Sequence, residues 1–171
     1  MQTSSEVTIK ADIKKVWRIM FEEFERSQDW LSLVPKSEVM KGKAADGANV
    51  AGRICYLQND ADKLIADEKI TKADPDNYYF EFVATTRNAP KAMPVKSNNV
   101  KIQLTEVQKG ETHVSWISEP NVTALGKVGA PALKKGIKKG FDQLLDDLKV
   151  YAETDQVSDK KRKSNEKYGI K

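Results

Sequence analysis

Apolar and polar residues alternate along the chain from Gly52 to Glu119, in segments that are separated by short turns. Alternation of this kind is typical of strands that bury one face. Asp74–Asn77 has the composition of a turn, with Pro75 in a favoured position, and Lys109–Gly110 forms another turn. Strands that follow one another through short turns pair in antiparallel fashion. The sequence therefore predicts an antiparallel sheet with one wet face and one apolar, aromatic face.

Residue parity identifies the side chains on the apolar face of this predicted sheet. One carboxylate, Glu68, has the same parity as the apolar residues around it. A buried carboxylate has to be hydrogen-bonded or become neutral, so Glu68 marks a special environment. The apolar-face residues are Leu64, Ala66, Ile70, Tyr78, Phe80, Phe82, Val100, Ile102, Leu104, Val114 and Trp116.

The N-terminal segment predicts a strand that is followed by two short helices. Val7 and Ile9 alternate with polar residues, and Asp12 is a favourable N-cap for the helix that follows. Apolar residues then recur at helical spacing over residues 13–24. The segment DWLSLVP predicts a second short helix or a turn, which Pro35 ends.

A long helix is expected near the C-terminus, around the segment ALKKGIKKGFDQLL. Its apolar residues fall within an arc of about 120°, the width expected of a helix that rests on a sheet. Gly136 and Gly140 lie at the edge of this arc, and each costs about 1 kcal/mol relative to alanine. They either let a strand approach closely or leave a hollow, and both alternatives stay open. The arc contains Leu133, Ile137, Phe141, Leu144, Leu145, Leu148 and Tyr151.

The net charge of +4 is concentrated at the C-terminus. Of the last twelve residues, six are Lys or Arg and one is Glu, so the body of the chain is close to neutral. A nucleic-acid-binding surface needs a basic face on the folded domain, so no nucleic-acid partner is expected. The KKRK run resembles a localisation or polyanion-binding patch, although a solvated end is the simpler interpretation. We predict one domain over residues 1–153 and a basic, mobile tail over residues 154–171.

The sequence shows no sign of export or of membrane insertion. No apolar run approaches the roughly 20 residues that span a bilayer, and the N-terminus lacks the order of a signal peptide. The single cysteine, Cys55, excludes an intramolecular disulfide. These features predict a cytoplasmic protein without stable membrane insertion, and they leave the oligomeric state open.

The order of these elements resembles the START-like superfamily, which includes pollen allergens, lipid-transfer domains and aromatic-polyketide cyclases. The features that carry the resemblance are Val16–Trp17, the segment from Trp30 to Pro35, the strand and turn from Glu68 to Asp74, and Trp116 in the last strand. It extends over roughly residues 4–153. The resemblance implies an α+β helix-grip fold: a curved, seven-stranded antiparallel sheet wraps around the long C-terminal helix, and two short helices follow the first strand. Such proteins usually enclose an apolar cavity between sheet and helix.

The resemblance also implies where a ligand would lie. The expected cavity wall consists of the apolar-face residues named above, together with Glu68, Gly136, Ile137, Gly140 and Phe141. The expected cavity mouth consists of Pro90, Met93, Pro94, Leu133, Lys134 and Lys138. We hypothesise that Lys134, Lys135 and Lys138 attract an amphipathic ligand with an anionic head. Removal of the last twelve residues is then expected to leave ligand binding unchanged.

Candidate residues for catalysis are few. The sequence has no nucleophile motif, no phosphate-binding glycine loop and no Cys/His cluster, so neither a metal nor a cofactor is expected. The one histidine, His113, lies out of phase with the apolar residues beside it and is expected to face solvent.

Three functions remain open. The first is carriage or sensing of a hydrophobic or amphipathic small molecule, such as a lipid or a polyketide. The second is a cyclase or dehydratase reaction with Glu68 as the acid–base candidate, near Tyr78 or Tyr79. The third is a co-chaperone-like protein-interaction domain with a filled cavity. A cavity well below about 300 Å³ would speak against the first.

Overall fold

The computed structural model describes residues 1–124, 126 and 129–170. Its strands form one seven-stranded sheet in the order β1-β7-β6-β5-β4-β3-β2. Every neighbouring pair is antiparallel, which confirms the predicted sheet. Irregular registers within β4–β5 and β6–β7 interrupt the ladders, and such bulges bend a sheet. The strands are β1 (Thr3–Ile9), β2 (Lys36–Val39), β3 (Gly52–Tyr56), β4 (Ile65–Asp74), β5 (Tyr79–Arg87), β6 (Val95–Gln108) and β7 (Glu111–Val122).

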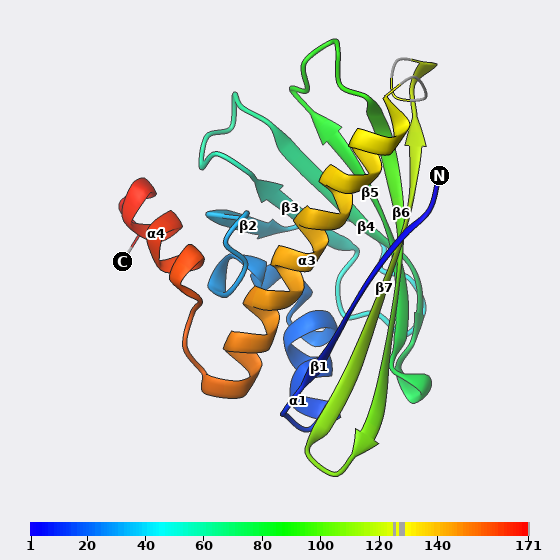
Figure 1. Cartoon of the computed structure of the whole chain (residues 1–171), viewed down its shortest axis with the longest axis vertical. Coiled ribbons are helices and arrows are strands. Elements are labelled where there is room, and N and C mark those ends of the chain that lie inside the picture. The colour runs from blue at the N-terminus through cyan, green and yellow to red at the C-terminus, as the bar shows by residue number, and fades with distance from the viewer. Residues whose placement is uncertain (125, 127–128, 171) are drawn as a thin grey trace.

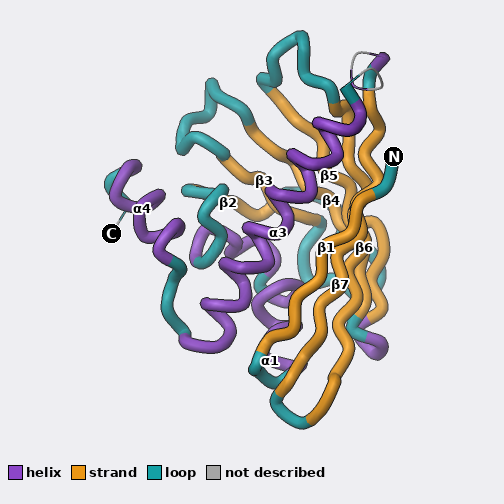
Figure 2. Tube along the Cα trace, viewed as in Figure 1, coloured by secondary structure: helices purple, strands orange, loops and turns teal. Residues whose placement is uncertain are grey.

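The helix α3 (Ala130–Thr154) crosses one face of the sheet obliquely (Figure 1). The helix α4 (Asp159–Tyr168) lies beyond the β2 edge of the sheet. The strands make one curved layer, and α1 and α3 lie on the same side of it (Figure 2). This arrangement is the helix-grip fold that the resemblance implies. Among the described residues, no helix is both long enough and apolar enough to cross a bilayer.

The first predicted helix is present but broken into unlike turns. Asp12 caps α1 (Ile13–Trp17) as expected, because its Oδ1 accepts a hydrogen bond from the Lys14 N–H at 2.9 Å. A wider, π-helical turn (Arg18–Glu22) and a tighter 3₁₀ helix (Phe24–Asp29) then replace the regular α-helix. The second short helix therefore begins earlier than predicted, and the segment DWLSLVP itself is mostly a turn.

Only the C-terminal half of α3 is packed into the core. Its buried apolar residues are Leu144, Leu145, Leu148 and Ala152, whereas residues 130–143 include no buried side chain. Hydrogen bonds from β1 and from the residue that follows it hold the second half of the helix. Ser5 Oγ donates to Asp142 Oδ1 at 2.7 Å, and the Lys10 N–H donates to Glu153 Oε1 at 2.7 Å. The N-terminal half of α3 thus stands over the sheet without closing onto it.

The basic tail is docked on the domain. Ser158 caps α4 by accepting a hydrogen bond from the Lys161 N–H, and its hydroxyl donates to Asp147 on α3. Lys161 is buried, and its Nζ donates to the Val34 carbonyl oxygen at 3.0 Å. Burial lowers the pKa of this lysine, while the nearby carboxylates of Asp29 and Asp147 oppose that effect. The composition of the tail suggested a segment with nothing to bury, but the aliphatic part of one lysine and a serine cap provide the contact.

We expect Gly52→Ala to destabilise the protein by about 1–3 kcal/mol, because the site has no room for a side chain. A Cβ at Gly52 would lie 2.1 Å from the Glu68 carbonyl oxygen on the neighbouring strand, and the glycine φ is +156°. Gly136→Ala is the control: its Cβ would meet nothing within 4 Å, and it should stabilise α3 by about 1 kcal/mol. Urea denaturation measures both, and a Gly52→Ala variant as stable as wild type would contradict the close approach.

Candidate functional site

An apolar cavity of about 270 Å³ lies between α3, the sheet and the segment that precedes β2. Two polar side chains reach it, those of Glu68 on β4 and Asn98 on β6. It lies beneath the N-terminal half of α3, where no side chain is fully buried and Phe141 is only partly buried against Trp116. The lining residues are Leu31, Leu33, Val34, Leu57, Ala66, Glu68, Val95, Asn98, Pro120, Ile137, Gly140, Phe141 and Leu144.

The structure brings five of the expected wall residues to this cavity, namely Ala66, Glu68, Ile137, Gly140 and Phe141. Most of the others belong to the packed core instead. The core residues are Ile70, Phe80, Phe82, Val100, Ile102, Leu104, Val114 and Trp116. Leu64 is half-buried away from the cavity, Tyr78 lines a depression beside α1, and Gly136 is exposed. The residues expected at the mouth lie outside the cavity wall, and these are Pro90, Met93, Pro94, Leu133, Lys134 and Lys138.

Aromatic packing explains why the cavity is smaller than the apolar face predicts. The rings of Phe80, Phe82 and Trp116 form a continuous chain of contacts across the sheet, with centroids 6.2 and 5.8 Å apart. Phe24 closes on Phe82 from the second short helix at 5.4 Å. These rings fill the space between the sheet and the short helices, and the cavity lies outside this packed region, under α3.

The two glycines of α3 face open space. A Cβ at Gly136 or at Gly140 would meet nothing within 4 Å, so neither glycine permits a close strand approach. The structure therefore excludes close packing at both positions, and only Gly140 is beside a hollow. Only Gly140 lines the cavity, while Gly136 lies one turn away on the exposed surface.

Glu68 is held in a buried ion pair with Arg53, its direct neighbour on β3. The guanidinium Nε donates to Glu68 Oε2 at 2.6 Å, Nη2 lies 2.6 Å from the same oxygen, and Nη1 donates to the Phe24 carbonyl oxygen at 3.0 Å. The Arg53 Cζ also lies 4.1 Å above the Phe24 ring. Burial by itself lowers the pKa of Arg53, but Glu68 and, secondarily, Cys55 raise it above its ordinary value, so the guanidinium stays charged.

This ion pair changes the chemistry expected of Glu68. Its carboxylate faces the cavity with a side chain that is 16% exposed, while Arg53 behind it is 5% exposed. The contact with the guanidinium holds this carboxylate in a fixed position at the cavity wall, which suits a hydrogen-bond acceptor for a ligand. Both contacts from Arg53 use Oε2, which leaves Oε1 as the oxygen that can accept from a ligand.

Several site residues could not be read from alternation. Arg53 has the same parity as the buried Cys55 on its strand, so both side chains point inward. A basic residue at an inward position is the one sign in the sequence that Arg53 is buried. Leu31, Leu33 and Val34 come from the segment before Pro35, which the sequence predicted as a short helix or a turn without placing it beside α3.

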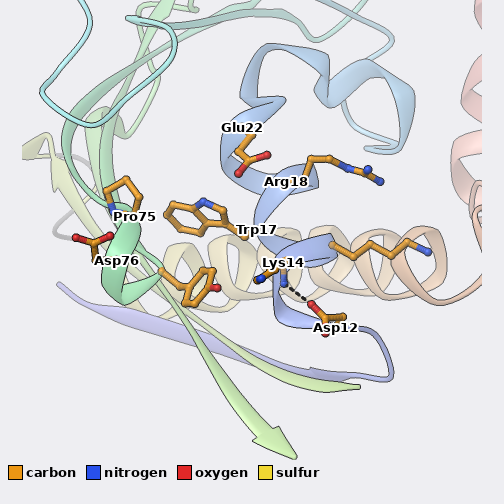
Figure 3. Close-up of a pocket in the computed structure, with 9 residues that line it drawn as sticks. Asp12, Lys14, Trp17, Arg18, Glu22, Pro75 and Asp76 are labelled. Atoms are coloured by element: carbon orange, nitrogen blue, oxygen red, sulfur yellow. Dashed lines mark hydrogen bonds between the residues drawn. The ribbon is translucent and has the colours of Figure 1, made fainter. Parts of the chain in front are cut away.

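A larger depression of about 710 Å³ lies on the outside of α1 (Figure 3). Trp17 points from α1 toward Pro75 there, and charged side chains of both signs surround it, including Lys14, Arg18 and Asp76. The mixture of charges and the contact with solvent make it a poor site for an apolar ligand. In the described part of the chain, no group of His, Cys, Asp and Glu residues is placed to hold a metal ion.

We expect Glu68→Gln to lower the free energy of unfolding by about 3–5 kcal/mol, because it leaves a buried guanidinium without its counter-charge. Asp67→Asn is the matched control on the same strand. Asp67 pairs with Arg87, whose side chain is half exposed, and such a pair contributes at most about 1 kcal/mol. Small and equal losses for the two variants in urea denaturation would show that the Arg53–Glu68 pair is not a buried charge pair.

The buried thiol of Cys55 predicts a pH dependence of stability. Burial, with a smaller contribution from Glu68, raises the pKa of Cys55 from 9.0 to about 12. As pH rises, the thiol ionises in the unfolded chain before it ionises in the folded protein. The free energy of unfolding is therefore unaffected below the pKa of the unfolded thiol. Above that pKa it falls by about 1.4 kcal/mol per pH unit until the pH approaches 12. Thermal or urea unfolding at alkaline pH should show a shallower fall for Cys55→Ala. Parallel pH profiles for the two proteins would contradict the prediction.

Solved structures share this fold at low sequence identity. A START superfamily protein from Mycobacterium smegmatis aligns with a TM-score of 0.69 and 10% identity, over 88% of this chain and 96% of that chain. The di-domain ARO/CYC BexL, from the BE-7585A biosynthetic pathway, aligns with a TM-score of 0.68 and 10% identity, over 87% of this chain and 45% of BexL. XoxI from Bacillus cereus is 22% identical with a TM-score of 0.62, over 88% of this chain and 94% of XoxI. At these identities the likeness shows the fold alone.

Sequence comparison assigns the family. No curated protein matches the chain. The family described as polyketide cyclase / dehydrase and lipid transport matches residues 1–153, which include the whole sheet and all but the last residue of α3. This match confirms the START-like resemblance. The chain therefore belongs to the polyketide cyclase/dehydrase and lipid transport family.

Proposed function

We propose that the protein binds a hydrophobic or amphipathic small molecule in the cavity beneath α3. The observation that carries this proposal is an apolar hollow under a helix whose N-terminal half has no buried side chain. A helix that served only to cover the core would be expected to place large side chains there, where this chain has Gly140. The family description, which includes lipid transport, supports the same function.

The dimensions of the cavity limit the ligand to a small one. A volume of about 270 Å³ lies near the lower end of small-molecule sites, which begin at about 300 Å³. Such a space suits a single hydrocarbon chain or a small ring system. The apolar wall would bury the chain, and Glu68 Oε1 with Asn98 would accept or donate hydrogen bonds at its polar end. Asn98 Oδ1 already accepts a hydrogen bond from the Ser118 hydroxyl at 2.8 Å, so the amide N–H groups of Asn98 would be the donors to a ligand.

The proposal favours binding over acid–base catalysis. Glu68 is the carboxylate at the cavity wall, and its ion pair with Arg53 fixes it in place as a hydrogen-bond acceptor. Tyr78 and Tyr79, the other acid–base candidates, do not line the cavity. The side chain of Tyr79 instead donates to Glu81 Oε1 at 2.6 Å. Carriage or sensing of a ligand requires none of these proton transfers.

The test fills the cavity from the helix side. Gly140→Leu should lower the affinity for the fluorescent probe anilinonaphthalene sulfonate by about tenfold or more. It should lower the affinity for dodecanol, measured by displacement of the probe, by a similar factor. Gly136→Leu is the matched control on the exposed face of the same helix. Both substitutions replace a helical glycine, so both should raise the thermal midpoint, and only Gly140→Leu should reduce binding. Equal binding by the two variants and the wild type would place the ligand elsewhere and overturn the proposal.

A further inference from the structure

A second hollow adjoins the cavity on the side of α4. We call it the lysine groove: Lys160, Lys163, Lys167 and Tyr168 form its α4 side, and Leu33 and Leu57 form the opposite side. Its volume is about 360 Å³. It lies beyond the β2 edge of the sheet, where α4 is drawn in red in Figure 1.

The lysine groove and the cavity share part of their walls. Leu33 and Leu57 line both of them, so the apolar cavity and the lysines are neighbours on either side of these two side chains. Leu33 is 50% exposed, which is unusual for a leucine that also contacts a cavity. An apolar pair at the junction of a hollow interior and a cationic rim is the arrangement that an amphipathic molecule requires.

The orientation of α4 explains why the lysines face the groove. Lys160, Lys163 and Lys167 are spaced so that they share one face of the helix. The buried Lys161, which bonds to the Val34 carbonyl oxygen, fixes the rotation of that helix about its axis. Because Val34 also lines the cavity, the same contact ties the lysine face to the cavity wall.

Some lysines and arginines of α3 and α4 are paired with carboxylates of the same helix, whereas the lysines of the groove are not. Arg162 pairs with Asp159, Lys138 with Asp142, and Lys149 with Glu153. Within the described residues, Lys160, Lys163 and Lys167 form no ion pair with a carboxylate. Three like charges on one short helix face repel each other, and an anion placed between them would relieve that repulsion.

We propose that the lysine groove binds the anionic headgroup of a single-chain amphiphile, a carboxylate or a phosphate monoester, whose hydrocarbon chain enters the cavity between Leu33 and Leu57. This inference rests on the proposed function and adds the headgroup site and the entry route. It moves the anion-binding role from Lys134, Lys135 and Lys138, which line neither hollow, to the opposite end of the cavity. It also reverses the expectation that the last twelve residues are dispensable for binding.

The test compares two ligands with the same chain by calorimetry of the full-length protein. Dodecanoate carries the anionic head, and dodecanol lacks it. Wild-type protein should bind dodecanoate more tightly than dodecanol, and high salt should reduce the difference. The triple variant K160Q/K163Q/K167Q should weaken dodecanoate binding by about tenfold and leave dodecanol binding unchanged, because it removes only exposed charges. Dodecyl phosphate should follow dodecanoate, and inorganic phosphate, which has no chain, should bind far more weakly than either.

The matched control is K134Q/K135Q/K138Q on α3, which removes the same number of lysines. It should leave both affinities unchanged. Loss of dodecanoate affinity in this variant, with no loss in the α4 variant, would overturn the headgroup site while leaving the cavity proposal intact. Equal affinities of the wild type for dodecanoate and dodecanol would also overturn the headgroup site and leave the cavity proposal intact. Wild-type protein that binds neither ligand would overturn the proposed function and this inference together.

Discussion

The C-terminal half of α3 is anchored on the sheet, and this anchor fixes the position of everything around the cavity. Leu144, Leu145 and Leu148 are buried, and each contributes about 2 kcal/mol through the apolar surface that it removes from water. Residues 130–143 contribute no fully buried side chain, and their contacts with the sheet include a partly buried Phe141 and the Ser5–Asp142 hydrogen bond. A helix held firmly at one end and standing over the sheet at the other produces a hollow without any local strain.

Asp147 extends this anchor to the segments on either side of α3. It is fully buried, and its carboxylate accepts hydrogen bonds from the Ser32 N–H, the Gln143 amide and the Ser158 hydroxyl. Ser32 belongs to the segment that lines the cavity, and Ser158 begins α4. A buried carboxylate is costly unless its oxygens are satisfied, and these three donors satisfy it. The cavity wall, the long helix and the tail therefore meet at one side chain.

The buried Arg53–Glu68 pair has a different consequence from Asp147. Buried pairs of this kind contribute little net stability, because desolvation of both ions offsets their attraction. Such a pair instead holds charged groups in fixed positions inside the protein. Here the pair holds an acceptor oxygen at the wall of an otherwise apolar cavity, and Arg53 is tied in turn to the second short helix through Phe24. A ligand at this wall meets a fixed polar contact.

Much of the fold could be predicted from the sequence because alternation and helical spacing report burial directly. The antiparallel sheet, the Asp12 cap, the long helix and the inward parity of Glu68 all follow from local patterns. The break in the first helix does not, because Ile13 to Phe24 keeps a helical pattern while packing forces its turns to widen and then tighten. Alternation likewise predicts that Phe80 and Phe82 point inward, but it cannot distinguish a packed core from a cavity wall.

The sequence by itself determined which faces are apolar, where the chain turns and that a helix must cover the sheet. Each of these depends on residues that are close together in the chain. Only the tertiary structure decided that Gly140 faces a hollow, that Arg53 lies against Glu68, and that Lys161 docks the tail on Val34 beside the cavity. These contacts join residues on separate strands or helices, so their geometry depends on how whole elements pack, which local composition does not encode.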